Sequence, residues 1–318
     1  MLTKQKIIHI HPTRFCNLSC AHCYSTSGPR LRDELSVDDI LRATYRLRAF
    51  GYVWASLSGG EPTLHSEFAE LCKGLSRQGY KVSVITNGWN IKNLLHSVAE
   101  SAVDFCAVSF DGPEELHDKI RGRKGAFRAA MAGLSALKRR RLTVGAIISA
   151  TRLSMPNLPT LTEKLAAAGA SRIQFHPIAA VGRAKETAWS GLNELDDEAL
   201  VRLIMMTRAL EYAWPHVTFQ CDATVSSNID FKQQLEATGQ LITPLVLSEQ
   251  GDLLPYAYGI HRKFRLGTIH QSTIDPFVTK PLGELLKLAA DRCKQGLATS
   301  YYSELCAASY RRCCVTRA

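Results

Sequence analysis

The sequence predicts an α/β fold in which parallel strands alternate with helices, followed by a C-terminal extension of a different pattern. Over the first two thirds of the 318 residues, β-branched apolar runs alternate with amphipathic stretches of helical length. Polar segments with glycines follow several of the expected strands, at the edge where parallel α/β folds place their ligands. After about residue 215 the alternation stops. We therefore expect two domains, residues 1–214 and residues 215–318.

The expected elements follow one another in regular order. Strands are expected at about 6–11, 52–58, 81–86, 103–110, 142–150 and 171–177, and helices at about 37–50, 66–77, 91–100, 125–140, 158–168 and 196–212. The first helix shows both end signals, because Ser36 can cap its start and Gly51 follows its end. These six strand–helix units are too few for a closed eight-unit barrel. In the extension we expect a short strand at 217–220, a hairpin at 245–258 and a helix at 281–296.

The composition and net charge limit which classes of protein are possible. With 46% apolar and 21% charged residues, it is that of an ordinary globular chain. No segment approaches eighteen uninterrupted apolar residues, and residues 1–12 lack the apolar core of a signal peptide, so we expect a cytoplasmic protein with no membrane partner. The net charge of +10 could steer an anionic ligand, or could simply make a basic, soluble surface. No nucleic-acid-binding module is recognisable, so no nucleic-acid partner is expected.

Three cysteines near the N-terminus are the most specific signal. Cys16, Cys20 and Cys23 stand at C-x3-C-x2-C spacing. A structural zinc ion takes four ligands, so three close thiols fit better an iron–sulfur cluster with one iron left for another ligand. A zinc site completed by a distant His or Cys is the alternative. Cys72 and Cys106 lie in apolar runs, where we expect them to be packing residues.

Five short motifs follow the cysteines in a fixed order. They are Ser58–Thr63 (Ser-Gly-Gly-Glu-Pro-Thr), Thr86-Asn87-Gly88, Ser109–Gly112, Leu116–Gly122, and His176-Pro177 with Gly182-Arg183-Ala184. Over about residues 6–185 this series resembles the radical S-adenosylmethionine (radical SAM) superfamily. The resemblance implies an open, partial (β/α)6 barrel. It is closest to the branch with a SPASM or twitch extension, many of whose members modify ribosomally made peptides.

The resemblance also implies cofactors and an activity. In this family three cysteines bind three irons of a [4Fe–4S] cluster, and SAM chelates the fourth. One-electron reduction then cleaves SAM to methionine and a 5′-deoxyadenosyl radical, which abstracts hydrogen from a substrate. A radical SAM enzyme is therefore expected, with an electron donor such as flavodoxin or ferredoxin.

The motifs imply a SAM-binding set, residue by residue. Backbone groups of Gly59, Gly60, Glu61 and Pro62 would meet the methionine ammonium, since glycine lets a backbone approach a ligand closely. Arg121 would grip the SAM carboxylate with its guanidinium fork, unless it pairs with Asp118 on the surface. The other candidates are polar or aromatic groups that could reach the ribose, the amino-acid end or the adenine: His22, Thr86, Asn87, Ser109, Asp111 and His176. A loop histidine, a turn at Asn87-Gly88 and a packed histidine are the simpler explanations for His22, Asn87 and His176.

A second group of cysteines lies near the C-terminus, at C-x12-C-x6-C-C spacing: Cys293, Cys306, Cys313 and Cys314. They predict an auxiliary metal cluster, most simply a second [4Fe–4S], with a redox pair as the competing interpretation. Adjacent side chains point apart in an extended chain, so ligation of one cluster by both Cys313 and Cys314 would strain it. Pro255 is followed by Tyr256, where relatives of the resembled branch usually carry a ligating cysteine, so their second cluster cannot be carried over unchanged.

Three functions are compatible with these features. The leading hypothesis is hydrogen abstraction from a peptide, followed by cross-linking or epimerisation. In an epimerase Cys221 is the candidate hydrogen donor, although an ordinary packing role explains this residue as well. The second hypothesis keeps the radical chemistry but takes a small metabolite, since no leader-peptide module is visible before the first strand. The third is a non-catalytic iron–sulfur carrier or sensor, which would not need the Gly-Gly-Glu-Pro motif.

Overall fold

The computed structural model describes residues 6–100, 102–186, 189, 191–192, 194–222, 244–255 and 258–270. Strand and helix alternate in them as expected, and each element expected between residues 6 and 213 is present. The strands are β1 (Lys6–Ile10), β2 (Tyr52–Leu57), β3 (Lys81–Thr86), β4 (Phe105–Phe110), β5 (Thr143–Ala150), β6 (Arg172–Pro177) and β7 (Thr218–Cys221). The helices are α1 (Val37–Arg48), α2 (Phe68–Arg77), α3 (Lys92–Ala99), α4 (Glu114–Arg121), α5 (Ala126–Arg139), α6 (Leu158–Ala167), α7 (Arg183–Glu186) and α8 (Asp197–Ala213).

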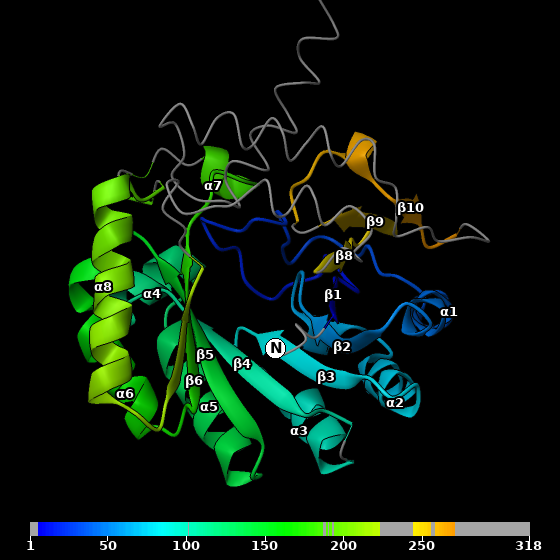
Figure 1. The fold of residues 1–318 in the computed structure, drawn as a ribbon, viewed down its shortest axis with the longest axis horizontal. Helices are drawn as coiled ribbons and strands as arrows, with labels where there is room; N and C mark the ends of the chain where they lie inside the picture. The colour runs from blue at the N-terminus through cyan, green and yellow to red at the C-terminus, as the bar shows by residue number, and fades with distance from the viewer. Residues whose placement is uncertain are drawn as a thin grey trace, which may run out of the picture.

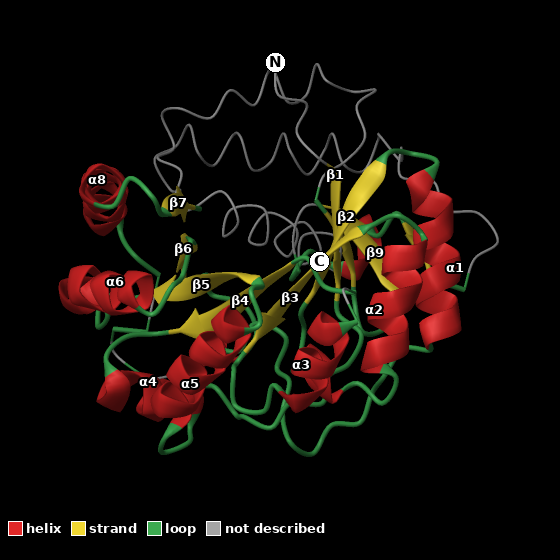
Figure 2. Ribbon diagram, turned by 90° about the horizontal axis from the view of Figure 1, so that it is seen from below, coloured by secondary structure: helices red, strands yellow, loops and turns green. Residues whose placement is uncertain are grey.

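Three further strands are β8 (Leu245–Leu247), β9 (Asp252–Pro255) and β10 (Gly267–Thr268). The described strands form one sheet of ten, in the order β10-β9-β8-β1-β2-β3-β4-β5-β6-β7. From β1 to β7 each strand pairs in parallel with the next. The sheet curves into an open arc, and the large helices lie along its convex side (Figures 1 and 2). The prediction of a partial barrel, open and without eight units, is confirmed.

The alternation of side chains along each strand separates a helix-covered outer face from an inner face within the arc. In β4, Cys106, Val108 and Phe110 are completely buried in the core beneath the helices. Ser109 lies between two of them and points to the inner face, where it lines a pocket. Cys72, on α2, is also completely buried in this core. The packing roles expected for Cys72 and Cys106 are confirmed.

The sheet runs across the domain boundary expected at residue 214. β7 pairs with β6 beyond this point, and β8 (Leu245–Leu247) pairs in parallel with β1. The expected hairpin forms from β8 and β9 (Asp252–Pro255), with β10 (Gly267–Thr268) antiparallel to β9. The helix expected at 281–296 lies outside the described residues.

Two helices were not expected from the sequence, the four-residue α7 and the longer α4. α4 begins after Pro113 and ends at Gly122, which has a φ of 66°. Two of the three side chains that it buries are polar, His117 and Arg121, with Ile120 as the apolar one. The helix is eight residues long and has only two apolar side chains, Leu116 and Ile120, so the sequence showed this segment only as a motif.

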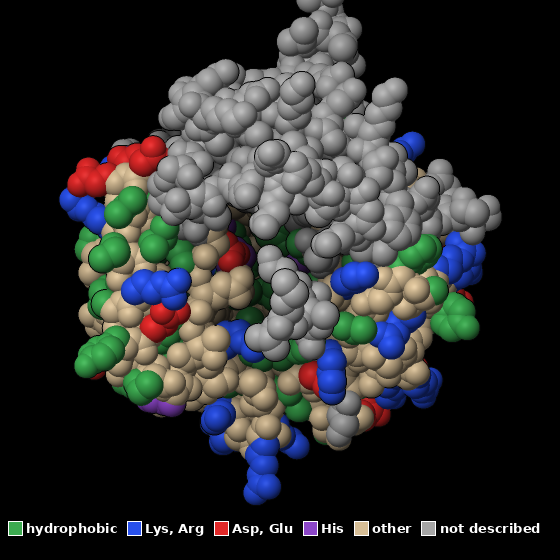
Figure 3. All heavy atoms as spheres, in the orientation of Figure 1, with side chains coloured by type: hydrophobic (Ala, Val, Ile, Leu, Met, Phe, Trp, Pro, Cys, Tyr) green, Lys and Arg blue, Asp and Glu red, His purple; other side chains and the backbone are tan. Residues whose placement is uncertain are grey.

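Two features of the described residues bear on a membrane or nucleic-acid partner: the length of the helices and the distribution of charge on the face shown in Figure 3. None of the helices in the described part of the chain is long and apolar enough to cross a bilayer. In Figure 3, Lys and Arg side chains are scattered over the described part of the visible face, with Asp and Glu among them. On this face the excess of positive charge is dispersed, as expected for a basic, soluble surface.

The segment between β1 and α1, residues 11–36, carries the three N-terminal cysteines, and we call it the cysteine loop. It packs directly on the turn that follows β2. Gly60 donates its N–H to the Thr13 carbonyl, and the next N–H, of Glu61, reaches the Phe15 carbonyl, both at 2.9 Å. A Cβ added at Gly60 would lie 2.3 Å from the Phe15 oxygen, so only glycine allows this approach.

We expect Gly60→Ala to lower the free energy of unfolding by about 1–3 kcal/mol, as overpacking does, because the loop must shift to admit a methyl group. Chemical denaturation of the full chain measures this. Gly28→Ala is the matched control in the same loop, since its added Cβ would meet nothing closer than Ser19 Oγ at 3.9 Å. Equal unfolding midpoints for the two variants would contradict the close contact at Gly60.

Candidate active site

The three cysteines of the cysteine loop come together at the carboxyl edge of the sheet. Cys16 and Cys20 are buried, and Cys23 is partly buried. The loop closes on itself through backbone hydrogen bonds, including one from Cys16 N–H to the Gly28 carbonyl at 3.3 Å. This closure turns the three thiols toward one space.

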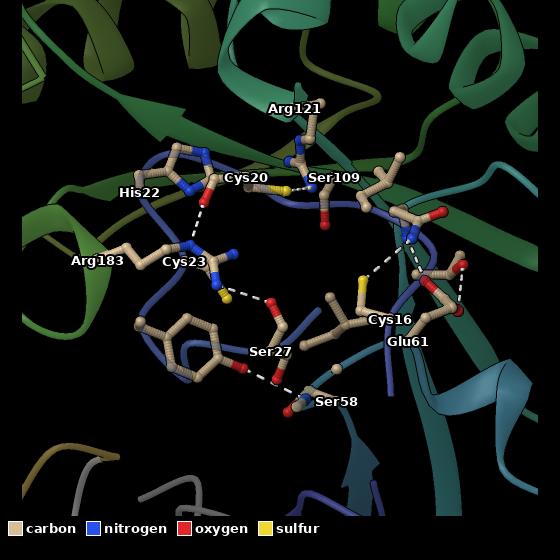
Figure 4. Close-up of a pocket in the computed structure, with 17 residues that line it drawn as sticks. Cys16, Cys20, His22, Cys23, Ser27, Ser58, Glu61, Ser109, Arg121 and Arg183 are labelled. Atoms are coloured by element: carbon tan, nitrogen blue, oxygen red, sulfur yellow. Dashed lines mark hydrogen bonds between the residues drawn. The ribbon is translucent and has the colours of Figure 1, made fainter. Parts of the chain in front are cut away.

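That space is a pocket between the loop and the ends of β2, β3 and β4 (Figure 4). Most residues singled out by the motifs share its wall: Cys16, Cys20, His22, Cys23, Gly59, Gly60, Glu61, Thr86, Asn87, Ser109 and Arg121. Pro62 opens the short 3-10 turn that follows Glu61, and Asp111 is buried behind Arg121. His176 lies elsewhere on the inner face. The sequence motifs therefore predicted the wall of one pocket.

Glu61 is a structural brace. Its side chain is 1% exposed and accepts hydrogen bonds from Thr63 Oγ1 (2.7 Å), Thr86 Oγ1 (2.8 Å) and the Asn87 N–H (2.8 Å). Burial raises its pKa, and these hydrogen bonds act in the opposite direction. The carboxylate thus ties the turn after β2 to the end of β3. An ammonium group only donates, so this turn can offer it backbone carbonyl oxygens, not N–H groups.

Asp111 organises the opposite wall. It is fully buried and binds the Arg121 guanidinium through both oxygens, with Arg121 Nη2 at 3.0 Å, while His22 Nε2 lies 2.7 Å from Oδ1. Burial alone would raise the pKa of Asp111, but Arg121 and His22 outweigh it and hold that pKa well below its usual range. Two nitrogens of Arg121 are engaged in this way. The third, Nη1, points to Cys20 Sγ at 4.0 Å (Figure 4).

The alternative pairing of Arg121 with Asp118 is wrong. The Asp118 carboxylate accepts the N–H groups of Gly125 and Phe127, at the start of α5. A carboxylate at that place satisfies backbone donors that a helix leaves free and favours the helix dipole. Asp118 therefore anchors the turn between α4 and α5.

Each of the three sulfur atoms has a polar neighbour. Asn87 Nδ2 lies 3.9 Å from Cys16 Sγ, Arg121 Nη1 lies 4.0 Å from Cys20 Sγ, and the Ser25 hydroxyl lies 3.4 Å from Cys23 Sγ. Hydrogen bonds to ligating sulfurs are among the features that tune an iron–sulfur cluster. Such contacts suit thiolates in a cluster.

The thiols fit a polynuclear cluster better than a single ion. Burial raises the pKa of the Cys16 thiol to about 12 and that of Cys20 to about 11, so both need a metal to ionise them. Among the residues that the structure describes, no three His, Cys, Asp or Glu side chains converge on one ion position. Three thiols around one pocket suit a group that takes three thiolate ligands and leaves one position for another ligand, as their spacing predicts.

Arg183 holds the cysteine loop in place, a role that the sequence did not indicate. Its Nε donates to the Cys20 carbonyl and its Nη1 to the Ser27 carbonyl, both at 2.8 Å, while its backbone N–H donates to the Cys23 carbonyl at 3.0 Å. Gly182, with a φ of 58°, allows this contact, since a Cβ there would lie 2.4 Å from the Cys23 oxygen. The Gly-Arg-Ala motif was the only signal of this clamp in the sequence.

Cys221 does not face the inside of the arc. It alternates with Gln220 along β7 and packs against the apolar core on the outer face, on the side of α8. It also interacts electrostatically with Arg208 on α8, which agrees with a position on the outer face. This placement fits the packing explanation. The hypothesis that Cys221 donates hydrogen in the pocket is wrong, because its thiol lies on the other side of the sheet.

The auxiliary-cluster candidates Cys293, Cys306, Cys313 and Cys314 all lie outside the described residues. The pair Pro255-Tyr256 is described only as far as Pro255, the last residue of β9. The second cluster therefore stays a prediction.

Relatives of known function match part of this chain. The sporulation killing factor maturation protein SkfB of Bacillus subtilis (strain 168) is 30% identical over 206 residues, which cover 64% of this chain and 48% of SkfB. Fe-coproporphyrin III synthase of Methanosarcina barkeri is 29% identical over 204 residues, which cover 64% of this chain and 51% of that enzyme. The chain thus spans about half the length of these curated relatives.

Solved structures share the fold. SuiB of Streptococcus suis, bound to S-adenosylmethionine, superposes with a TM-score of 0.72 at 16% identity, covering 88% of this chain and 68% of SuiB. The enzyme anSMEcpe with bound AdoMet gives 0.68 at 18% identity and covers 98% of both chains. At these identities the likeness concerns the fold alone. Residues 10–164 match the family model of the Radical SAM superfamily, so this part of the chain carries that superfamily's domain.

Proposed function

We propose that this protein is an enzyme that binds a [4Fe–4S] cluster through Cys16, Cys20 and Cys23 and cleaves SAM reductively. The observation that carries the proposal is the single pocket whose wall holds all three thiols beside Gly59, Ser109 and Arg121. When bound, the cluster and SAM supply the electron transfer and the 5′-deoxyadenosyl radical that takes hydrogen from a substrate.

The chain's own part is to position and shield. The turn at Gly60 and the clamp at Arg183 fix the loop from two sides, so the thiol positions are set before anything binds. Arg121 brings positive charge to Cys20, which favours the thiolate form that a cluster needs. Asp111 keeps this guanidinium and His22 in place.

The same wall suggests how SAM would be held. Arg121 Nη1 is the part of the guanidinium that points into the pocket, so it is our candidate partner for the SAM carboxylate. Carbonyl oxygens of the Gly59–Pro62 turn are our candidates for the ammonium group. Ser109 and His22 line the same wall and are candidates for the ribose and the adenine. Thr86 and Asn87 hold Glu61 and the loop, and we assign them to the support of the site.

For the substrate we favour a ribosomally made peptide, which the enzyme would cross-link or epimerise. The proposal is supported by relatives that are named as maturation or biosynthesis proteins of peptides: SkfB, the subtilosin biosynthesis protein AlbA (26% identical) and the mycofactocin maturase MftC (33% identical). A one-electron donor such as flavodoxin or ferredoxin would reduce the cluster. The C-terminal cysteines would hold the auxiliary cluster.

A small metabolite is the second candidate substrate. Fe-coproporphyrin III synthase and a pre-heme d1 synthase (30% identical over 216 residues) are relatives of similar identity. The third hypothesis, a non-catalytic carrier, gains no support from the pocket, since a carrier has no use for a space beside its cluster.

The proposed activity can be tested by removing the three ligands together. We expect the triple Ala variant of Cys16, Cys20 and Cys23 to lose all SAM cleavage, because no iron would remain to bind SAM. Anaerobic reconstitution followed by detection of 5′-deoxyadenosine measures this. Cys72→Ala is the control, since Cys72 is buried beneath the helices. Wild-type protein that releases no 5′-deoxyadenosine under reducing conditions would refute the proposed activity.

The triple variant also tests the auxiliary cluster. If the C-terminal cysteines bind iron, reconstituted triple variant retains about the iron of one [4Fe–4S] cluster. Iron at background level would argue against the second cluster without affecting the first.

The positioning role of Arg183 predicts a different outcome. We expect Arg183→Lys to keep the fold but to release iron faster to a chelator, because lysine cannot donate in two directions from a planar fork. Each lost charged hydrogen bond is worth about 1.5–3 kcal/mol of loop stability. Arg202→Lys is the matched control, as Arg202 pairs with Glu198 on the exposed face of α8. Equal iron-release rates in the two variants would contradict the role of Arg183 in holding the cysteine loop.

A further inference from the structure

A second group of polar side chains lies on the inner face of the sheet, where β6 and β7 end. His176, at the end of β6, places Nδ1 2.8 Å from Oδ2 of Asp222, the residue after β7. Their side chains are 42% and 33% exposed, although they lie on the concave side of the arc. Exposed surface in such a place borders open space inside the fold. None of the functions assigned above uses this pair.

Asp222 is an anchor, because its oxygens are already occupied. Besides His176 it accepts hydrogen bonds from Gln174 Nε2, at 3.2 and 3.0 Å to the two oxygens, and from Gln220 Nε2 at 3.0 Å. Burial works against its charge, but His176 and these amide groups outweigh burial and lower the pKa of Asp222. A carboxylate that accepts from three side chains holds its neighbours in place and has little capacity left to act as a base.

The Asp222 carboxylate lies against Nδ1 of His176 and favours the charged form of the ring. It raises the pKa of His176 against the effect of burial. In the imidazolium form both ring nitrogens are donors, so Nε2 then carries a proton on the side of the ring away from Asp222. Nε2 makes no hydrogen bond to any residue in the described part of the chain, so it is available as a donor within the arc.

His9 faces this pair from the other end of the arc. It lies on the inner side of β1, just before the cysteine loop begins. The pKa of His9 is lowered to about 4, mainly by burial and also by His176, while Asp222 acts in the opposite direction. The low pKa favours the neutral form of His9, and its dependence on His176 and Asp222 means that the three side chains interact electrostatically across the inner face of the sheet.

We propose that His176, oriented by Asp222, binds a carboxylate group of the substrate. The proposal rests on the proposed function, since it gives that enzyme's substrate an anchoring point. An imidazolium N–H with no partner favours an anionic acceptor, because a charge-assisted hydrogen bond is about twice as strong as a neutral one. The ligand class is a carboxylate, either the α-carboxylate of a peptide or a side-arm carboxylate of a peptide residue or small molecule. His176 would then serve the substrate, not the adenine of SAM.

The test uses the full-length protein with its cluster reconstituted and its histidines labelled at Cε1. The His176 resonance is identified by its loss in His176→Gln and followed by NMR during titration with three probes. N-Acetylglycine carries an α-carboxylate, propionate imitates a side-arm carboxylate, and N-acetylglycinamide carries none. We expect at least one carboxylate to shift the His176 resonance, and the amide to bind about tenfold more weakly or worse. The better of the two carboxylates identifies the source.

Asp222→Asn removes the anchoring charge while keeping the size of the side chain. We expect it to weaken carboxylate binding about tenfold, since the imidazolium loses its charged partner. Glu100→Gln is the matched control, because Glu100 forms a similar pair with His96 on the surface, at 3.8 Å. That variant should bind the probes as the wild type does.

Three results would overturn the proposal: no shift of the His176 resonance with either carboxylate, equal affinity for the amide, or unchanged binding in Asp222→Asn. Probe binding requires no SAM cleavage, whereas the proposed activity is judged by 5′-deoxyadenosine from the wild type. Each proposal can therefore fail while the other survives.

Discussion

The contact on which the site depends most is that between the backbone of the cysteine loop and two glycines. Gly60 approaches the loop from the end of β2, and Gly182 approaches it from the segment after β6. At either position a Cβ would fall within 2.4 Å of a loop carbonyl oxygen. The loop is held between them by main-chain contacts, and the Arg183 side chain adds two hydrogen bonds to its carbonyl groups. Arg183 can clamp the loop only because Gly182 lets it come close.

A second constraint is the burial of charge around this loop. Glu61 and Asp111 are both almost fully buried, and each would be costly without its partners. Glu61 accepts hydrogen bonds from hydroxyl and amide donors, so its carboxylate connects the turn after β2 with the end of β3, and no ligand contact is assigned to it. Asp111 is satisfied by a guanidinium and an imidazole that themselves line the pocket. The first carboxylate therefore stiffens the site, and the second decides which cationic groups face it.

The sequence was sufficient for the order of the elements and for most of the pocket wall. The spacing of the three cysteines identifies them as a ligand set. The carboxyl ends of parallel strands lie on one edge of the sheet whatever their side chains are, so motifs that follow the strands come together there. It was not sufficient for pairings across the chain. That Asp111, and not Asp118, is the partner of Arg121 depends on the orientation of α4, and an eight-residue helix with two apolar residues does not show from sequence which polar side chains it buries. The side of the sheet on which Cys221 lies was also open, because a four-residue strand carries too little pattern to set its register.

The placement of thiols bears on the chemistry that the described part of the chain can support. Besides the three cysteines of the loop, Cys72, Cys106 and Cys221 are the cysteines of the described residues, and all three pack in the core outside the sheet. A thiol that returns hydrogen to a substrate radical has to border the space inside the arc, and these do not. The inner face instead presents hydrogen-bond donors, with Arg121 at one end and His176 at the other. In the proposed enzyme, such a surface would hold a substrate by its oxygen atoms while one C–H bond is aligned with the radical. Selectivity would then come from where the substrate is anchored, and a thiol donor, if the reaction needs one, would have to come from outside the described residues.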